Sequence, residues 1–317
     1  MNNKHISVAF VVGTFPKISE TFIIDQACDL IDRGIDVFIY AFSPGEEDRD
    51  KISKRYFEYN LERRTAYLNN TESKLLKTLL ILPRFLQLLF LKPAAIFKIP
   101  ANPKVLFWDL RPFFGKKHDL YHCHFGNVGS SFVMIKKVLD IKEKFITSLY
   151  GQDVSSGFID YPNKDVYKDL KKESSAFIAM SNFMKKRIVA KGFDESKIQV
   201  LPMFGINTDN YPFKERKLEP GNVIQMATVG RFVEKKGFDD ILRALAIVKN
   251  KTDKKFMCNI IGGGPLEPNL RAIAEELGLN DVVSFRGYMR LEDIINYFLK
   301  MHFYLQPSKT ASNGDME

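Results

Sequence analysis

Short apolar runs alternate with amphipathic segments along most of this sequence. The run Ile6–Val12 is continuously apolar, which is typical of a strand buried on both faces of a parallel sheet. Residues 19–34 follow with apolar side chains at helical spacing, and Val37–Ala41 is apolar again. This order predicts a βαβ unit, in which a helix crosses between two parallel strands.

The alternation continues and then restarts, which predicts two domains in the 317 residues. Further strands of the first half are expected at 119–123, 144–149, 176–179 and 199–202. Residues 207–221 are polar and contain two prolines, so we expect a linker there. Strands of the second half are expected at 223–229, 256–261, 282–285 and 303–305. The predicted fold class is α/β, with Rossmann-like parallel-sheet domains over 1–206 and 222–317.

Ligands of open parallel sheets bind at the carboxyl ends of the strands, so we expect the two domains to face a cleft there. No GxGxxG motif is present, so the main sequence evidence for a dinucleotide-binding site is missing. The second half has about 96 residues and no closing helix, and we expect an incomplete domain.

Composition narrows the classes of function. Cys28, Cys123 and Cys258 are scattered, which excludes a disulfide framework and fits a reducing compartment. The first apolar run is too short for a secretory signal, so we expect a cytoplasmic protein. The net charge is +9, but no basic–aromatic module for DNA or RNA is present, and nucleic acid is not an expected partner.

The segment 74–104 contains six Lys or Arg residues and no acid, with apolar residues between the charges. Pro83 and Pro93 interrupt the apolar run, so it is too short to span a membrane. Two interpretations stay open. The segment is either a helical hairpin packed on the domain, or a basic, apolar face that lies on anionic lipid.

Loops at the expected strand ends contain the candidate chemistry. Arg231 and Lys236 follow a strand and precede a helix, where cations would neutralise a diphosphate leaving group. The alternative is an ordinary solvated basic loop. Gly262 and Gly264-Pro265 leave backbone amides accessible to a phosphate or a sugar, or else form a tight turn. Gly13-Thr14 precedes a helix N-terminus, which favours an anion.

Polar residues also follow two strands in the middle of the chain. His122 and His124 flank Cys123, but no second cluster accompanies them, and no metal site is expected. His124 is expected to bind a ligand hydroxyl. Asp153 is expected either to orient a sugar hydroxyl or to cap the following helix.

The ordered motifs resemble those of a known family. They are GTFPKISETF, HCHFG, YGQDVS, VGRFVEKKGFDDILRAL, IIGGGPLEPNL, FRGYM and LQPSKTASNGDME. Together they resemble the retaining family-4 glycosyltransferases of the GT-B fold, particularly bacterial enzymes of exopolysaccharide and colanic-acid type. The resemblance implies transfer of a sugar from a UDP- or GDP-sugar to a saccharide acceptor, lipid-linked in our interpretation, without a metal ion or other cofactor.

The resemblance also implies residue roles. Arg231 and Lys236 would stabilise the departing diphosphate. The positions implied to contact the donor are Gly13, Thr14, Gly262, Gly264, Pro265, Tyr288 and Ser308. His124, Tyr150 and Asp153 would contact the sugar or the acceptor.

Two departures from the family pattern stand out. Tyr150 replaces a histidine that contacts the sugar, and a phenol titrating near ~10 is a poorer proton carrier at neutral pH. Glu317 matches the first glutamate of a Glu-x7-Glu motif whose second glutamate lies beyond the chain, so we expect a truncated donor domain, and both an active and an inactive chain stay open.

The predicted function is therefore glycosyl transfer in cell-surface polysaccharide assembly, in the cytoplasm and at the inner face of the cytoplasmic membrane if 74–104 touches lipid. Two alternatives stay open. One is a nucleotide-sugar epimerase of the same fold, which would need no acceptor. The other is a catalytically idle binding subunit.

Overall fold

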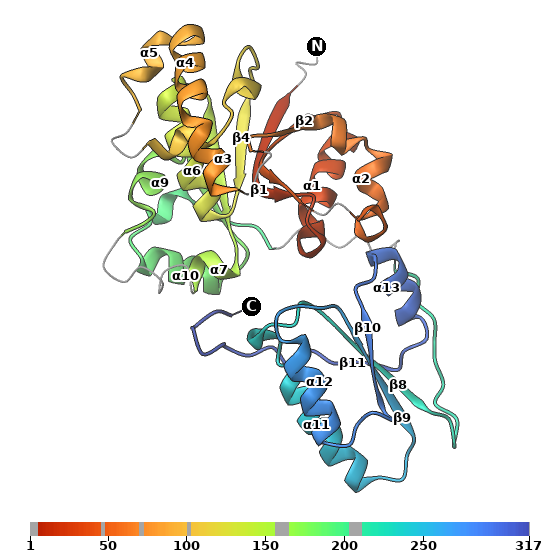
Figure 1. Ribbon diagram of the computed structural model, residues 1–317. Helices are drawn as coiled ribbons and strands as arrows, with labels where there is room; N and C mark the ends of the chain where they lie inside the picture. Colours follow the sequence, from red (N-terminus) through yellow and green to blue (C-terminus); the bar gives the residue numbers. More distant parts are fainter. Residues whose placement is uncertain are drawn as a thin grey trace. The chain divides into compact units, whose positions relative to one another are not determined.

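The structure is a computed structural model that describes residues 6–45, 48–69, 73–99, 103–155, 165–202 and 211–316. The chain divides into two compact units, Met1–Phe204 and Gly205–Glu317. Each contains a parallel sheet with helices packed on it, so the α/β class is confirmed (Figure 1). The expected linker begins outside the described ranges, and its described part, from residue 211 onward, contains no helix or strand.

The first unit has a seven-stranded sheet in the order β3-β2-β1-β4-β5-β6-β7, and every neighbouring pair is parallel. Its strands are β1 (Ser7–Phe15), β2 (Asp36–Pro44), β3 (Thr65–Tyr67), β4 (Leu120–His124), β5 (Lys144–Leu149), β6 (Ala176–Ala179) and β7 (Ile198–Val200). The sequence predicts all of them except β3, which is too short to show a pattern.

Helices cover both faces of this sheet, and β1 shows why its sequence is continuously apolar. Val8 and Phe10 point into a core shared with α1 (Thr21–Asp32). Ala9 and Val11 point to the other face, into a core shared with α6 (Gly126–Leu139). Alternate side chains of a strand point to opposite faces, so a strand between two helical layers needs apolar residues at every position.

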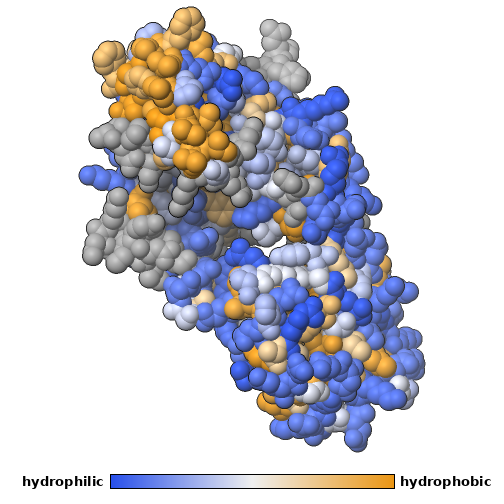
Figure 2. All heavy atoms as spheres, viewed as in Figure 1, coloured by the Kyte–Doolittle hydropathy of each residue, from blue (hydrophilic) through white to orange (hydrophobic). Residues whose placement is uncertain are grey.

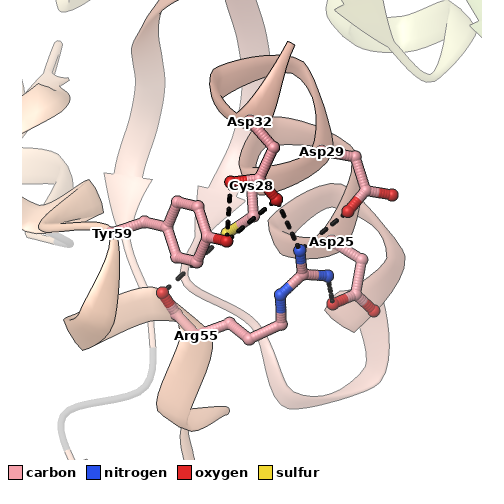
Figure 3. Close-up of polar contacts among 6 residues, drawn as sticks. All are labelled: Asp25, Cys28, Asp29, Asp32, Arg55 and Tyr59. Atoms are coloured by element: carbon pink, nitrogen blue, oxygen red, sulfur yellow. Dashed lines mark hydrogen bonds and ion pairs between the residues drawn. The ribbon is translucent and has the colours of Figure 1, made fainter. Parts of the chain in front are cut away.

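An ionic cluster joins α1 to α2 (Lys54–Glu58) (Figure 3). The Arg55 guanidinium donates to Asp25 and to Asp29 at 2.7 Å each, and lies 3.9 Å from Asp32. The Tyr59 hydroxyl donates to Asp32 at 2.8 Å. Because the three acids lie about one turn apart on α1, one arginine of α2 reaches all three of them.

The basic, apolar segment forms three helices: α3 (Lys74–Leu79), α4 (Ile81–Leu91) and α5 (Pro93–Ile96). The chain breaks between α3 and α4 at Leu80, and Pro83 lies in the first turn of α4, where its missing N–H does no harm. Leu88 of α4 is buried in the core of the unit. Within the described residues, no helix has the length and apolarity to cross a bilayer.

The second unit has a four-stranded parallel sheet in the order β10-β9-β8-β11. Its strands are β8 (Ile224–Val229), β9 (Phe256–Ile261), β10 (Val283–Gly287) and β11 (Phe303–Tyr304). Its helices are α11 (Phe238–Lys251), α12 (Glu267–Glu276) and α13 (Leu291–Phe298). All four strands lie where the sequence predicts them, and α11 and α12 run side by side along the sheet (Figure 1).

Candidate functional site

The loops after the four strands of the second unit meet at one edge of its sheet, because the strands are parallel and all end there. This edge holds seven of the predicted residues. They are Arg231 and Lys236 after β8, Gly262, Gly264 and Pro265 after β9, Tyr288 after β10, and Ser308 after β11. The structure therefore brings the predicted donor-side residues of this unit together.

The glycines after β9 let these loops approach closely. Gly262 has φ +130°, and a Cβ there would lie 2.0 Å from the Gly230 carbonyl oxygen. Gly264 has φ +153°, and a Cβ there would lie 2.8 Å from the Phe232 nitrogen. A backbone hydrogen bond also joins the loops after β8 and β9, because Phe232 N donates to Gly263 O at 2.9 Å. The tight-turn interpretation of these glycines thus has direct structural support, while a contact to phosphate stays a prediction.

The loop after β8 also contains Lys235, whose side chain has a different environment from those of Arg231 and Lys236. Lys235 is mostly buried and pairs with Asp315 at 3.2 Å. Arg231 is exposed and forms no ion pair within the described part of the chain. The aliphatic stem of Lys236 packs beside Gly230. The unpaired guanidinium is the group of this loop that is available to an anion.

The sequence gives no sign of the contacts that hold this edge together. Glu234 accepts from the Ser312 backbone N–H at 2.8 Å and from its hydroxyl at 2.7 Å, which ties the loop after β8 to the segment after β11. Gln306 donates to Ser308 at 2.7 Å and accepts from Tyr304 at 2.7 Å. These residues lie far apart in sequence or in an irregular segment, and only the fold makes them neighbours.

Tyr288 lies over the glycine turn. A Cβ on Gly263 would lie 2.6 Å from the Tyr288 ring, and the ring is still 45% exposed. A half-exposed aromatic ring can stack against a flat ring of a ligand. This agrees with the contact to the donor that the resemblance implies for Tyr288, which stays a prediction.

Gly13 and Thr14 require a correction. The sequence places them in a loop after the first strand, but β1 continues through Phe15. Thr14 pairs with Ser43 and Phe15 with Pro44 of β2, so the strand continues past the glycine. A glycine is typical of the end of a strand, but backbone pairing with β2 continues β1 past Gly13.

The residues after β4 and β5 form a closed polar cluster. His124 is fully buried, and its Nδ1 forms a hydrogen bond of 2.9 Å with the Tyr150 hydroxyl. Its Nε2 has no hydrogen-bond partner among the described residues. Asp153 accepts from the backbone N–H groups of Tyr150 and Gly126 at 3.0 Å each, which makes it a cap for α7 (Gly151–Val154). Of the two roles considered for Asp153, the structure displays the capping one.

Burial controls the protonation of this cluster. Loss of solvation raises the pKa of Asp153 to about 6 and lowers the pKa of His122 to about 4. The same cause lowers the pKa of His124 well below its usual value and raises the pKa of Tyr150. Both histidines are therefore neutral at pH 7.

Two further predictions concern the glutamate at position 317 and a metal site. Glu317 lies outside the described residues. Across the described ranges, no group of three or more His, Cys, Asp and Glu residues could hold a metal ion. His122 and His124 instead pair with Ser148 and Tyr150.

Two parallel-sheet units in one chain, with loops gathered at the strand ends, are the architecture of GT-B glycosyltransferases. Residues 19–209 match the family described as Glycosyltransferase Family 4, and residues 209–314 match the one described as Glycosyl transferases group 1. The chain belongs to glycosyltransferase family 4, and it is a glycosyltransferase rather than the epimerase considered above.

Individual relatives agree with this assignment. The amylovoran biosynthesis glycosyltransferase AmsK of Erwinia amylovora is 30% identical, over 98% of this chain and 78% of the relative. The putative colanic acid biosynthesis glycosyltransferase WcaL of Escherichia coli strain K12 is 27% identical, with the same coverage. The crystal structure of Anabaena HepE in complex with UDP and glucose superposes with a TM-score of 0.65 at 16% identity, over 97% of this chain and 75% of that one, which shows the common fold.

Proposed function

We propose that the chain transfers a sugar from a UDP- or GDP-sugar to a saccharide acceptor, lipid-linked at the inner face of the cytoplasmic membrane, in exopolysaccharide or other cell-surface polysaccharide assembly. The names of the amylovoran and colanic acid relatives support the pathway class. In this proposal the second unit binds the donor and the first unit binds the acceptor. One observation supports the donor site above all: an exposed, unpaired Arg231 beside Lys236 at the edge where four loops meet.

The chemistry follows from the charge that develops on the leaving group. When the bond between the sugar and the diphosphate breaks, negative charge grows on the diphosphate oxygens. The Arg231 guanidinium and the Lys236 ammonium would stabilise that charge, with help from backbone N–H groups of the glycine turn. We propose that these groups do the work without a metal ion and that the sugar is transferred with retention of configuration.

Calorimetric titration of the 317-residue chain with UDP, GDP and NAD tests the donor site. We expect saturable binding of UDP or GDP, none of NAD, and the same affinity in EDTA. Arg231→Ala should weaken binding about tenfold or more, since a charge-assisted hydrogen bond contributes about 1.5–3 kcal/mol.

Arg243→Ala is the matched control. Arg243 is also an exposed arginine of the second unit, but it lies on α11, more than a turn away from the loop edge. It changes the net charge equally and should leave the affinity unchanged. A folded chain that binds neither nucleotide, or equal losses in the two variants, would contradict the donor assignment.

A further inference from the structure

The helices α3 and α4 are apolar on two opposite sides. On the inner side, Ile81, Phe85 and Leu88 pack against the core of the first unit. On the outer side, large apolar side chains lie exposed with helical spacing. We call them the α3–α5 surface: Leu75, Leu79, Leu82, Leu86, Phe90 and Phe97. Figure 2 shows a hydrophobic area over α4 and α5. A helix that is apolar all round normally has both sides covered.

The number of exposed apolar side chains sets this surface apart. Phe90 is 88% exposed and Phe97 is 93% exposed, and four exposed leucines accompany them. Single exposed apolar residues need no explanation, but a contiguous group of six marks a binding surface. We therefore expect a partner outside this unit to cover the α3–α5 surface when the protein functions.

Charge distinguishes between the possible occupants. The segment 74–104 carries six cations and no acid. Arg84 donates to the Leu106 carbonyl and Lys92 to the Leu139 carbonyl, and within the described residues neither side chain forms an ion pair with a carboxylate. Lys98 pairs with Asp140 at 2.9 Å, but Asp140 is shared with Lys142. A second copy of this chain would bring like charges together, whereas anionic lipid headgroups would attract them.

We infer that the α3–α5 surface is a monotopic membrane-docking site, which lies in the plane of an anionic bilayer with Phe90 and Phe97 inserted among the acyl chains. Helices of this kind bury an apolar face at the headgroup boundary and surround it with lysine and arginine. The 11 residues of α4 are too few to span a bilayer, for which about 20 are needed. The inference stands independently of the donor site, because it concerns a different surface.

Flotation with vesicles tests the docking site directly. The full chain should float with phosphatidylglycerol–phosphatidylcholine vesicles, bind pure phosphatidylcholine far more weakly, and lose affinity for the anionic vesicles in high salt. Phe90→Ser and Phe97→Ser together should reduce the affinity about tenfold or more, because two inserted aromatic rings are lost. Both side chains are exposed, so the variant should fold normally, which its circular dichroism and melting temperature would verify.

Phe213→Ser is the matched control, because Phe213 is 87% exposed and lies in the other unit. It should float as the wild type does. Leu82→Gln with Leu86→Gln gives a second variant on the same surface with the same expected loss. The inference is overturned if the wild type does not bind anionic vesicles, or if the variants of the α3–α5 surface bind as well as Phe213→Ser. A dimer of the wild type that these variants dissociate, with no vesicle binding, would assign the surface to a second copy instead.

Discussion

His122 and His124 make the stability of the first unit depend on pH. The unfolded chain binds a proton at each histidine near pH 6.5, while burial lowers the pKa of folded His122 to about 4 and holds that of His124 well below its usual value. Between these values the unfolded state holds more protons, so stability is lost as the pH falls. Asp153 opposes this, because its pKa is raised to about 6 and its folded state holds the extra proton. As the pH falls, the two histidines together lower the stability of the first unit more than Asp153 raises it.

We therefore predict that the first unit is less stable at pH 5 than at pH 7. For His122 alone the loss is about 2 kcal/mol. His122→Gln, which keeps a hydrogen-bonding group near Ser148, should remove that share of the pH dependence. Urea unfolding followed by the fluorescence of Trp108, in the first unit, measures it. An unchanged difference between the two pH values in His122→Gln would show that this histidine is not the cause.

At the scale of loops and strands, the site depends on how closely the turns after β8 and β9 approach. Gly262→Ala would place a Cβ 2.0 Å from the Gly230 carbonyl oxygen at φ +130°. We expect a loss of about 3 kcal/mol or more in the stability of the second unit, together with the loss of UDP binding. Gly278→Ala is the control, because Gly278 has φ +64° with nothing within 4 Å and should cost only about 1 kcal/mol.

Denaturant unfolding followed by circular dichroism, with parallel UDP titrations, measures both glycine variants. Equal stability losses would mean that the loops can separate without consequence, and the tight contact would then not define the site. UDP binding retained in Gly262→Ala would equally remove the glycine turn from the donor site.

The elements themselves could be predicted because a parallel strand buried on both faces leaves a continuous apolar run, as in β1 and β6. The convergence of Arg231, Gly262, Tyr288 and Ser308 followed from parallel strands ending at one edge. The end of β1 could not be predicted, because a glycine such as Gly13 is typical of a strand end and only pairing with β2 extends the strand. The bond from Ser312 to Glu234 joins segments 78 residues apart, and nothing local encodes it.

Across the whole molecule, the two units differ in how their polar groups are placed. In the first unit, His124, Tyr150 and Asp153 face one another in a buried cluster. In the second unit, Arg231 and Tyr288 are exposed to solvent. A charged nucleotide needs accessible cations, which favours the second unit as the donor site in our proposal, while the α3–α5 surface belongs to the first. The two proposals therefore place donor binding and membrane docking in different units.

That division predicts where a nucleotide stabilises the protein. Each unit has its own hydrophobic core, and the one tryptophan, Trp108, packs against Phe42 in the first. UDP at 100 times its dissociation constant should stabilise the unit that binds it by about 2.7 kcal/mol. We expect the calorimetric transition of the second unit to rise while the fluorescence midpoint of Trp108 stays in place, and Arg231→Ala to abolish the rise. A shift of the Trp108 midpoint as large as the calorimetric one would mean that the first unit shares in donor binding, and the donor site could not belong to the second unit alone.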